Sequence, residues 1–273
     1  METRPVEPAY PHTTVELVAR RRDAEGLWEL ILDGWRVAEH TQPGQFVNIR
    51  LPRSGSDPLL RRPMSVAFVV GDRFGVLVQS VGVGSNIITQ APLGETFDVL
   101  GPLGSTFPPP VRGSRVAFVG GGVGVAPLRF AFERFAEWCG AEVLVGARSE
   151  PLLPFRGYFE GTGQARLSTD DGSVGLKGTV LDLLQARHQA QPFERVYTCG
   201  PPRMMEGVGA FCARQGIECY ASLEARMACA MGQCLGCVVP KRDGGYVRVC
   251  TEGPVFDAWD IRLDADLGWS RGR

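Results

Sequence analysis

Four cysteines near the C-terminal end of the chain are spaced like the ligands of a metal cluster. They form the pattern C-x4-C-x2-C…C and are Cys229, Cys234, Cys237 and Cys250. This spacing is typical of plant-type [2Fe–2S] sites, in which one tight loop supplies three thiolates and a returning strand supplies the fourth. The small residues Ala228, Ala230, Gly232 and Gly236 allow such a loop to close and to turn backbone N–H groups toward sulfur. The pattern predicts a [2Fe–2S] cluster on these four thiolates, with Met231 and Leu235 shielding it from water.

Zinc, disulfides and buried structural thiols are the alternative interpretations. Zinc ligands usually come as separated C-x2-C pairs, and here only Cys234 and Cys237 form such a pair. Disulfides are typical of secreted proteins, and the N-terminal stretch has no apolar core that could serve as a signal peptide. The spacing therefore favours the cluster over these alternatives.

The composition is that of an ordinary globular protein with room for two domains and a small module. The chain has 273 residues, of which 44% are hydrophobic and 22% charged, and its net charge is −1. Such a small charge argues against nucleic acid or an anionic membrane as the main partner. No apolar run approaches the ~20 residues that a membrane helix needs. Eight cysteines without a secretory signal indicate a reducing compartment, so we expect a cytoplasmic redox protein.

The first part of the chain has the pattern of short strands separated by turns. After a proline-rich lead-in over residues 1 to about 12, apolar and polar residues alternate over 15–19 and 28–32. Residues 45–51 and 74–80 add further strands, and residues 85–90 form one helical turn. The expected turns are Asp33-Gly34, Pro43-Gly44, Gly71-Asp72 and Gly101-Pro102. Short strands at this spacing predict a small antiparallel β-barrel, which we assign to residues 12–107.

After the Pro108-Pro109-Pro110 linker, strands alternate with helices. Strands are expected at 115–119, 142–146, 166–169 and 195–198, and helices at about 126–138, 178–187 and 204–215. This alternation predicts a parallel sheet with helices on both faces, assigned to residues 111–215. Residues 216–273 form a small C-terminal [2Fe–2S] module. The predicted fold class is thus multidomain β plus α/β: an antiparallel β-barrel, a parallel-sheet domain and the cluster module.

A glycine-rich turn, Gly120 to Gly124, follows the first strand of the predicted sheet and opens a helix. Backbone N–H groups and the positive end of a helix dipole meet at such a turn, which suits a pyrophosphate. The run does not match G-x-G-x-x-G, so the usual dinucleotide fingerprint is absent. Tight packing without a ligand is an equal alternative for this turn taken alone.

The segment Cys199-Gly200-Pro201-Pro202 ends a later strand of the same sheet. Its place puts it on the carboxyl edge of the strands, where ligands bind in such folds. An isolated C-G-P-P is more often a plain turn. Its position beside the first glycine turn favours a shared binding role.

Two stretches of the barrel carry groups that suit phosphate. Arg61-Arg62-Pro63-Met64-Ser65 presents a guanidinium and a hydroxyl on one strand-like segment, and arginine binds phosphate through paired charge-assisted hydrogen bonds. Gly82-Val83-Gly84-Ser85 opens the short helix and could hold the other side of a pyrophosphate. A solvated pair of arginines is the alternative for the first stretch.

The remaining polar motifs favour no hydrolytic chemistry. His12, His40 and His188 are scattered and form no triad or metal pair, so no catalytic side chain is assigned. The segment TDDGS at 169–173 is expected to be an Asp-Gly turn. Three further cysteines are expected to be core thiols: Cys139, Cys212 and Cys219.

Together these segments resemble the ferredoxin-reductase superfamily. The shared motifs are R-P-x-S at Arg62 to Ser65, G-G-G-x-G-x-A-P-L at Gly120 to Leu128, and C-G-P-x-x-M at Cys199 to Met204. The cysteine pattern and the stretches at 100–104, 169–173, 222–229 and 249–256 are similar to one family within it. That family is the electron-transfer subunit of NAD-linked (class 1B) dihydroorotate dehydrogenase. The resemblance extends from about Val15 to Asp260.

The resemblance implies an iron–sulfur flavoprotein with FAD in the barrel and NAD on the parallel sheet. Carried over position by position, FAD would contact Arg62, Pro63, Met64, Ser65, Leu77, Val78, Gln79, Gly84 and Ser85. NAD would contact Gly121, Gly122, Gly124, Cys199, Gly200 and Pro201. The four cysteines would hold the [2Fe–2S] cluster.

The resemblance also implies a partner: a separate catalytic subunit that contains FMN, in a heterotetramer of two copies of each subunit. Dihydroorotate would be oxidised at that FMN, and electrons would reach NAD⁺ through the cluster and FAD, as a step of pyrimidine biosynthesis. One alternative is a related subunit that passes electrons between NAD(P)H and a ferredoxin or a hydrogenase. A second is a zinc-stabilised interaction protein without enzymatic activity.

Two positions depart from the family pattern. Ala230 stands where many relatives have glycine, and Gln79 stands where relatives can carry a basic residue that contacts a flavin phosphate. The preference between NAD and NADP stays open, because Arg148 after the second strand of the sheet suits a 2′-phosphate or plain solvent equally.

Overall fold

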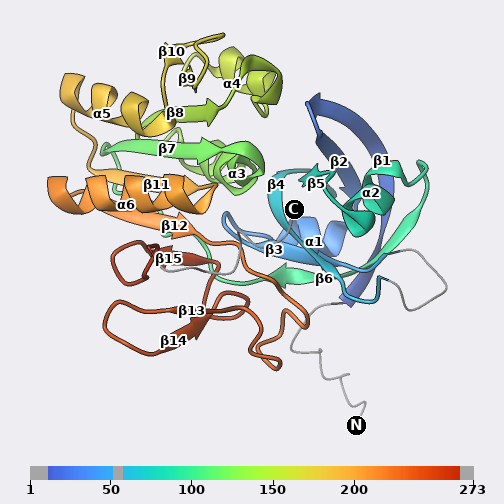
Figure 1. Ribbon diagram of the computed structural model, residues 1–273. Coiled ribbons are helices and arrows are strands. Elements are labelled where there is room, and N and C mark those ends of the chain that lie inside the picture. Colours follow the sequence, from blue (N-terminus) through green and yellow to red (C-terminus); the bar gives the residue numbers. More distant parts are fainter. Residues whose placement is uncertain (1–11, 52–57, 265–273) are drawn as a thin grey trace.

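The computed structural model describes residues 12–51 and 58–264. Figure 1 shows a barrel on the right, a helix-covered sheet on the upper left, and a smaller unit with the C-terminal strands below the sheet. The predicted proline-rich lead-in (residues 1–11) lies outside the described residues.

Six strands close an antiparallel barrel in the order β1-β2-β5-β4-β3-β6. The strands are β1 (His12–Ala24), β2 (Leu27–Asp33), β3 (Phe46–Ile49), β4 (Arg62–Val70), β5 (Arg73–Gln79) and β6 (Thr96–Leu103). Two helices contact β5 from outside, α1 (Trp35–His40) and α2 (Val83–Gln90). The predicted antiparallel barrel is therefore confirmed.

The barrel closes because alternate residues of its strands are apolar and meet in one interior. Leu30 and Leu32 of β2 and Val76 and Val78 of β5 are fully buried in the same cluster. Burying a side chain of this size stabilises the fold by about 1.5–3 kcal/mol relative to leaving it exposed. Because alternate residues point to opposite faces, Leu77 and Gln79 face away from this interior, toward the rest of the molecule.

The second body is a seven-stranded sheet in the order β10-β9-β8-β7-β11-β12-β15. Its parallel strands are β7 (Arg115–Gly121), β8 (Gly140–Ala147), β9 (Ala165–Thr169), β10 (Leu176–Lys177), β11 (Arg195–Cys199) and β12 (Glu218–Ser222). Its helices are α3 (Val125–Phe135), α4 (Arg156–Thr162), α5 (Val180–Ala190) and α6 (Pro202–Gln215), with short 3₁₀ turns at Gly122–Gly124 and Glu150–Leu152. The predicted fold class of this domain, a parallel sheet covered by helices, is confirmed.

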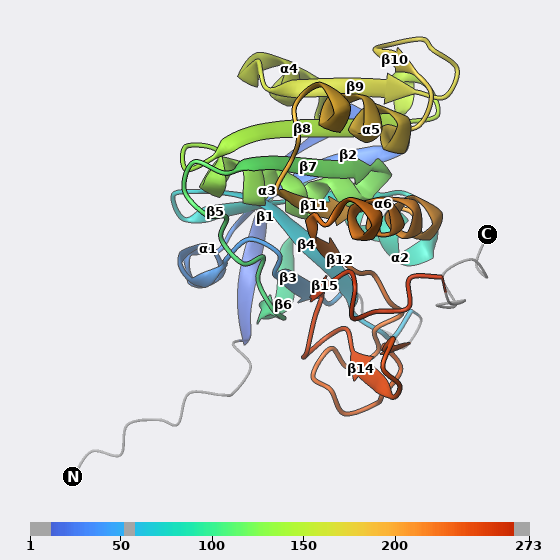
Figure 2. The same cartoon turned by 90° about the vertical axis from the view of Figure 1, so that its left-hand side faces the viewer.

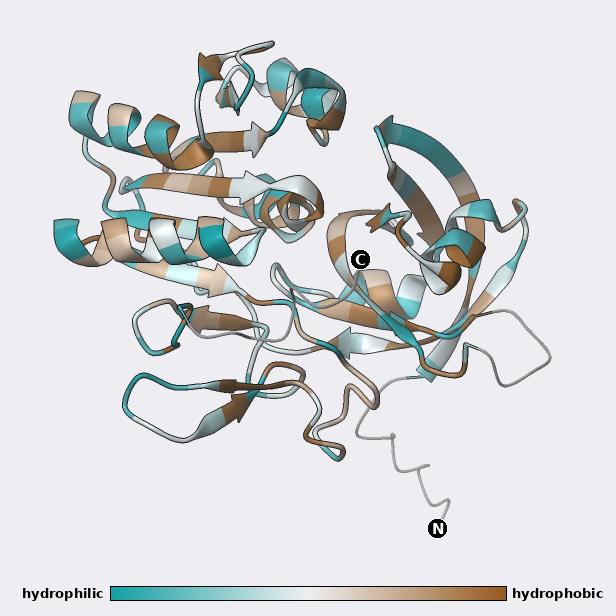
Figure 3. Ribbon diagram, in the orientation of Figure 1, coloured by the Kyte–Doolittle hydropathy of each residue, from teal (hydrophilic) through white to brown (hydrophobic). Residues whose placement is uncertain are grey.

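Helices cover this sheet on both faces because its central strands are apolar on both. In β7, Ala117 and Val119 pack in the cluster that contains α5 and α6, while Val116 and Phe118 pack with α3. Figure 3 shows β7 as hydrophobic along most of its length and pale at its tip, where the glycine turn begins. Parallel strands buried on both faces have this near-continuous apolar pattern.

A buried ion pair joins the barrel to the sheet. Arg129 of α3 reaches Glu29 of β2, with Nη1 and Oε2 2.9 Å apart, and both side chains are more than 90% buried. The guanidinium carbon of Arg129 lies over three aromatic rings, 4.1 Å from Phe68, 4.6 Å from Phe155 and 4.1 Å from Tyr158. This arrangement fixes α3, and with it the glycine turn, against β4 of the barrel.

The cysteine-containing unit is inserted between two neighbouring strands of the sheet. It carries the small antiparallel pair β13 (Val238–Pro240) and β14 (Tyr246–Arg248). It ends in β15 (Val255–Asp257), which pairs antiparallel with β12 so that Val255 faces Ser222. The backbone N–H of Leu223 donates to the carbonyl of Pro254 at 2.8 Å, so the two ends of segment 223–254 lie side by side. Figure 2 shows this unit beneath the sheet edge.

Several elements differ from their prediction. Gly101-Pro102 was expected as a turn but lies inside β6, so that prediction is wrong. No helix was expected at α1 or α4, and no strand at β6, β10, β12, β13 or β15. The strands β12, β13 and β15 fall within the range assigned to the cluster module, and the domain limits stay a prediction. Within the described ranges, no helix combines the length and apolar composition needed to cross a membrane.

Candidate functional site

The four cysteines lie in one loop and the turn beside it. Cys229, Cys234 and Cys237 belong to the loop before β13, and Cys250 follows β14. The N–H of Val249 donates to the carbonyl of Cys237 at 3.0 Å, which ties the returning strand to the loop. Cys237 and Cys250 are buried, Cys229 is half-buried and Cys234 is exposed.

Backbone N–H groups of the loop point at cysteine sulfur. The Sγ of Cys229 accepts from the N–H groups of Met231 and Cys234, each at 3.4 Å, and the Sγ of Cys234 accepts from Gly236 at 3.5 Å. Burial by itself would raise the pKa of Cys229, but these donors outweigh it and lower the pKa to about 7. Metal ligation requires thiolates, so the loop favours the state that binds metal.

The four thiols are associated in two pairs, Cys229 with Cys234 and Cys237 with Cys250, each linked by a side-chain hydrogen bond. Burial, followed by the hydrogen bond with Cys237 and the negative charge of that neighbour, raises the pKa of Cys250 to about 11. Among the described residues, no group of three or more His, Cys, Asp or Glu is placed to hold one metal ion. A [2Fe–2S] rhomb has two irons with two protein ligands each, and two pairs of thiols match that ligand set.

The loop holds its shape with unusual backbone angles. Ala230 and Leu235 have positive φ (both 56°), and Gly232 has φ 76°. A positive φ favours glycine, so the glycine that the family resemblance implies at the position of Ala230 would fit this backbone without strain. Leu235 is 59% exposed, so the prediction that it shields the sulfurs from water is wrong for the chain by itself. Met231 is half-buried against the core.

A cavity of about 440 Å³ opens between the barrel, α3 and the start of the cysteine unit. Its size lies within the ~300–1,000 Å³ typical of cofactor pockets. Of the residues expected at FAD, it is lined by Arg62, Pro63, Met64, Ser65, Leu77, Gln79, Gly84 and Ser85. Gly82 and Val83, from the turn predicted to hold a pyrophosphate, also line it. So do residues that were not assigned to FAD: Phe46, Val81, Val123, Ala126, Leu223, Glu224, Ala225, Met227 and Pro254.

Arg62 and the start of α2 form a subsite in this cavity that fits a phosphate group. A methyl group on Gly84 would lie 2.3 Å from Nε of Arg62, so the guanidinium rests on the backbone of the helix N-terminus. Ser85 Oγ accepts from the N–H groups of Val81 and Gly82, both at 3.0 Å, which shapes the first turn. A guanidinium beside helix N–H groups is a donor set that fits a pyrophosphate.

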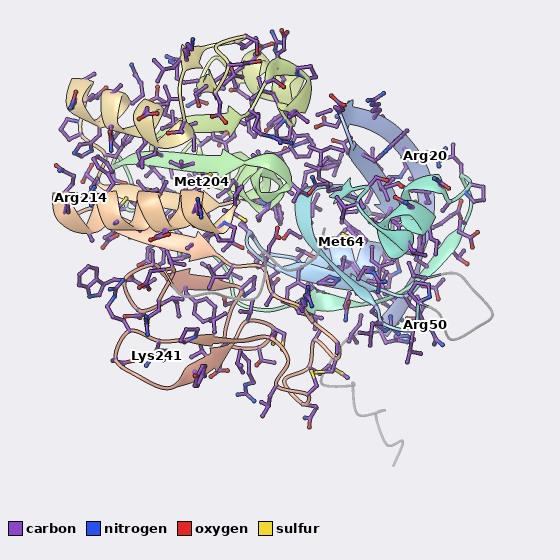
Figure 4. The ribbon with its side chains drawn as sticks, in the orientation of Figure 1. Arg20, Arg50, Met64, Met204, Arg214 and Lys241 are labelled. Carbon is purple, nitrogen blue, oxygen red and sulfur yellow. The ribbon has the colours of Figure 1, made fainter. Side chains whose placement is uncertain are left out.

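A second cavity, of about 530 Å³, lies at the carboxyl edge of the parallel sheet. Of the residues expected at NAD, it is lined by Gly121, Gly122, Gly124, Gly200 and Pro201. Its other lining residues are Glu25, Leu27, Gln79, Val123, Gly146, Ala147, Arg148, Leu152, Asp170, Thr179, Val180, Pro202, Met204 and Glu224. Figure 4 labels Met204 at the start of α6 and Met64 on the barrel, one from each cavity.

The two glycine turns of this edge pack backbone against backbone. A methyl group on Gly124 would lie 2.6 Å from both Cα and N of Gly200, closer than real carbon contacts allow. Gly200 itself has φ 156°, a backbone conformation that strongly favours glycine. The packing interpretation of the first turn is therefore confirmed, and the binding interpretation stays a prediction for a turn that lines the cavity.

The two cavities meet at three residues that line both: Gln79, Val123 and Glu224. Glu224 is exposed on the wall that the two cavities share, and desolvation by the surrounding protein raises the pKa of its carboxyl. Glu224 follows β12, so its place at the carboxyl edge could have been predicted from that strand, which was not expected. A group bound in the first cavity can touch one bound in the second at this junction.

Two expected residues do not line either cavity. Val78 is fully buried in the barrel interior, because strand alternation turns it away from Leu77 and Gln79. Cys199 is buried behind the edge, and burial raises its pKa well above the ordinary value. These two residues support the cavity walls from behind.

The remaining motifs are placed as follows. The TDDGS segment is a turn, as expected, with Asp171 accepting from the N–H of Ser173 at 2.9 Å, but Asp170 also lines the second cavity. Cys212 and Cys219 are buried and Cys139 is half-buried. His12, His40 and His188 have different neighbours (Asp98, Glu39 and the N–H of Phe193) and do not meet.

The amino-acid sequence matches a known protein family and several curated relatives. The model of the iron–sulfur cluster binding domain of dihydroorotate dehydrogenase B matches residues 224–262. The chain is 37% identical over 256 residues to the dihydroorotate dehydrogenase B (NAD(+)) electron transfer subunit of Geobacillus thermodenitrificans, covering 90% of this chain and 97% of the relative. The subunit of the same name from Bacillus caldolyticus is 36% identical, with the same coverage.

Solved structures with the same architecture include the following two chains. A chain of an NADH-dependent reduced ferredoxin-NADP oxidoreductase is 27% identical, with a TM-score of 0.83, covering 92% of this chain and 90% of that one. The flavohem-like FAD/NAD binding domain of a Vibrio cholerae nitric oxide dioxygenase shares the fold at 20% identity, with a TM-score of 0.65 over 75% of this chain and 93% of that one.

Proposed function

The chain belongs to the family of electron transfer subunits of dihydroorotate dehydrogenase B, and from this membership we propose how its residues divide the work. The four cysteines hold the [2Fe–2S] cluster, the first cavity holds FAD and the second holds NAD. The observation that carries the proposal is the junction at Gln79, Val123 and Glu224, where two cofactor-sized cavities share a wall. When bound, FAD exchanges single electrons with the cluster and a hydride with NAD.

The residues of this chain bind and orient rather than donate or abstract protons. Arg62 and the N-terminus of α2 supply donors for a pyrophosphate, and Ser65 supplies a hydroxyl to the same cavity. The turns at Gly124 and Gly200 bring backbone N–H groups to the second cavity. The protein around Glu224 partly desolvates its carboxyl and so raises its pKa, which places a carboxyl that ionises less readily than usual at the junction.

The catalytic partner subunit supplies electrons on the cysteine side of the molecule. Cys234 is exposed, and Leu235 next to it is 59% exposed, so the cluster site approaches the surface at this loop. We propose that the FMN-containing subunit docks over this loop, in an assembly with two copies of each subunit. Docking would cover Leu235 and give the shielding that the chain alone lacks.

The test is anaerobic addition of dihydroorotate to the complex of this chain with its partner subunit. We expect the flavin and cluster absorbance to bleach, and NADH to form when NAD⁺ is added. If dihydroorotate has no effect while NADH reduces the chain and electrons pass to ferredoxin or NADP⁺, the activity is that of the related oxidoreductase instead.

Gly124→Ala is expected to impair the NAD cavity. The added methyl would lie 2.6 Å from the Gly200 backbone, so the two turns must separate. Overpacking of this kind lowers the free energy of unfolding by about 1–3 kcal/mol, and we expect the Kd for NAD⁺ to rise roughly tenfold. Calorimetric titration with NAD⁺ checks this. The matched control is Gly161→Ala in α4, where a methyl meets nothing within 4 Å; equal affinity in the two variants would contradict the prediction.

Asp170→Asn is expected to shift the coenzyme preference toward NADP. Asp170 and Arg148 line the same end of the second cavity, and no ion pair joins them to each other in the described structure. A carboxylate there accepts a ribose hydroxyl and repels a 2′-phosphate. We expect the NADP-to-NAD ratio of kcat/KM to rise roughly tenfold when this charge is removed.

The matched control for this prediction is Asp171→Asn. Ser173 donates to the Asp171 carboxylate from its hydroxyl at 2.7 Å and its N–H at 2.9 Å, and these bonds hold the pKa of Asp171 below its usual range. This carboxylate accepts its hydrogen bonds within the turn, so its loss should leave the NADP-to-NAD ratio of kcat/KM unchanged. A similar shift in both variants would mean that turn stability, not charge, sets the preference.

A further inference from the structure

A buried hydroxyl beside the cysteine loop has no hydrogen-bond partner. Oγ1 of Thr251 is one of five buried side-chain polar atoms without a partner in the described part of the chain. Thr251 directly follows Cys250 in sequence. Burying a hydroxyl without an acceptor is unfavourable, so such an atom indicates an acceptor that belongs to the complete protein.

Gly232 places this hydroxyl close to a ligand sulfur. The backbone N–H of Gly232 lies close enough to the sulfur of Cys250 to act on its pKa. A methyl group on Gly232 would lie 3.1 Å from Cγ2 and 3.3 Å from Oγ1 of Thr251. Thr251 is therefore packed against the residue whose N–H approaches the Cys250 sulfur.

The other polar groups around Thr251 are engaged with one another. Arg248 donates from Nη1 to the carbonyl of Gly232 at 3.4 Å and from Nε to Glu252 at 2.7 Å. Glu252 also accepts from the N–H of Arg248 at 2.8 Å. The Thr251 hydroxyl has no partner among these groups, and it belongs to the residue next to Cys250, so sulfur is the acceptor that cluster binding would bring to it.

We propose that Thr251 donates a hydrogen bond to a sulfur of the [2Fe–2S] cluster and thereby raises the reduction potential of the cluster. This inference rests on the cluster assignment in the proposed function. Reduction adds one electron to the cluster and increases the negative charge on its sulfurs. A donor to sulfur therefore stabilises the reduced form more than the oxidised form.

The experiment is a redox titration of the cluster in the complex, followed by electron paramagnetic resonance, for the natural chain and for Thr251→Val. Valine keeps the shape of threonine and removes only the hydroxyl. We expect a more negative midpoint potential, with the ratio of reduced to oxidised cluster at a fixed applied potential lower by roughly tenfold. Thr251→Ser keeps the hydroxyl and should restore the potential. If valine prevents cluster assembly, Thr251→Ala makes the same deletion with a smaller side chain.

The control is Thr198→Val on β11, which removes another unpartnered buried hydroxyl away from the cysteine loop. It should leave the cluster potential unchanged. Equal potentials in the natural chain and Thr251→Val, both with full iron and sulfide content, would overturn the proposal and leave the cluster assignment intact. Absence of iron and sulfide from the natural chain would overturn both.

Discussion

Replacing Cys250 with serine is expected to abolish electron transfer from dihydroorotate to NAD⁺ while leaving the flavin reaction in place. Cys250 is the buried ligand on the returning turn, paired with Cys237. Serine supplies a hydroxyl that stays protonated and is a poor ligand for iron. We expect iron and sulfide to be lost and dihydroorotate-dependent NADH formation to fall by at least about 100-fold, beyond the loss that follows removal of an outer hydrogen-bond partner.

NADH oxidation with ferricyanide should survive in this variant. That reaction needs only the two cavities, and neither is lined by Cys250. The matched control is Cys139→Ser, which changes a half-buried thiol that bonds the carbonyl of Phe135. Its iron content and both activities should match those of the natural chain. If Cys250→Ser keeps two irons per chain and full transfer, the fourth ligand has been assigned wrongly.

Arg129→Ala is expected to cost the most stability of any single change considered. The substitution leaves Glu29 buried, with Arg21 at 2.7 Å as its remaining partner, and empties the space between three aromatic rings. Breaking one partner of a buried pair typically lowers the free energy of unfolding by about 3–5 kcal/mol, and the remaining arginine places this case near the lower end. Urea unfolding measures the loss.

This pair also aligns the two cavities, so a functional effect should accompany the loss of stability. Small misplacements of reacting groups are costly, and we expect flavin reduction by NADH to slow by roughly tenfold at temperatures where Arg129→Ala is folded. The control is Arg156→Ala, whose exposed ion pairs with Glu150 and Glu160 contribute little to stability. The double change Glu29→Gln with Arg129→Met removes both charges and should unfold less readily than Arg129→Ala. Equal losses in the exposed and buried cases would refute the role given to Arg129.

The sequence predicted those parts of the fold that are determined by residues close together in the chain. Cysteine spacing, strand alternation and glycine turns each report on a few neighbouring residues, and the antiparallel barrel and parallel sheet follow from them. Glu224 was missed because its position depends on β12 lying beside β11, a pairing between residues about 20 positions apart. The exposure of Leu235 was missed for the same reason, since burial depends on what packs over the loop.

Close packing between distant segments was equally hidden. The contact between Gly124 and Gly200 joins the turns that follow two different strands, β7 and β11, and neither motif alone requires it. Arg62 was expected to bind phosphate, but its position across Gly84 depends on the helix that follows β5. Arg129 had no motif at all. Its role depends on Glu29, one hundred residues earlier, and on three rings from different elements.

The pairing of Ser222 with Val255 has a consequence for how this protein can be divided. Because segment 223–254 leaves and rejoins the sheet at adjacent backbone positions, a short hairpin turn between β12 and β15 could replace it without changing the path of any other strand. The same topology means that the iron–sulfur unit can be gained or lost during evolution independently of the rest of the fold. A protein of this fold could gain or lose the unit through a single insertion or deletion. Such an event would have to rebuild the part of the first cavity wall that Leu223 and Glu224 form.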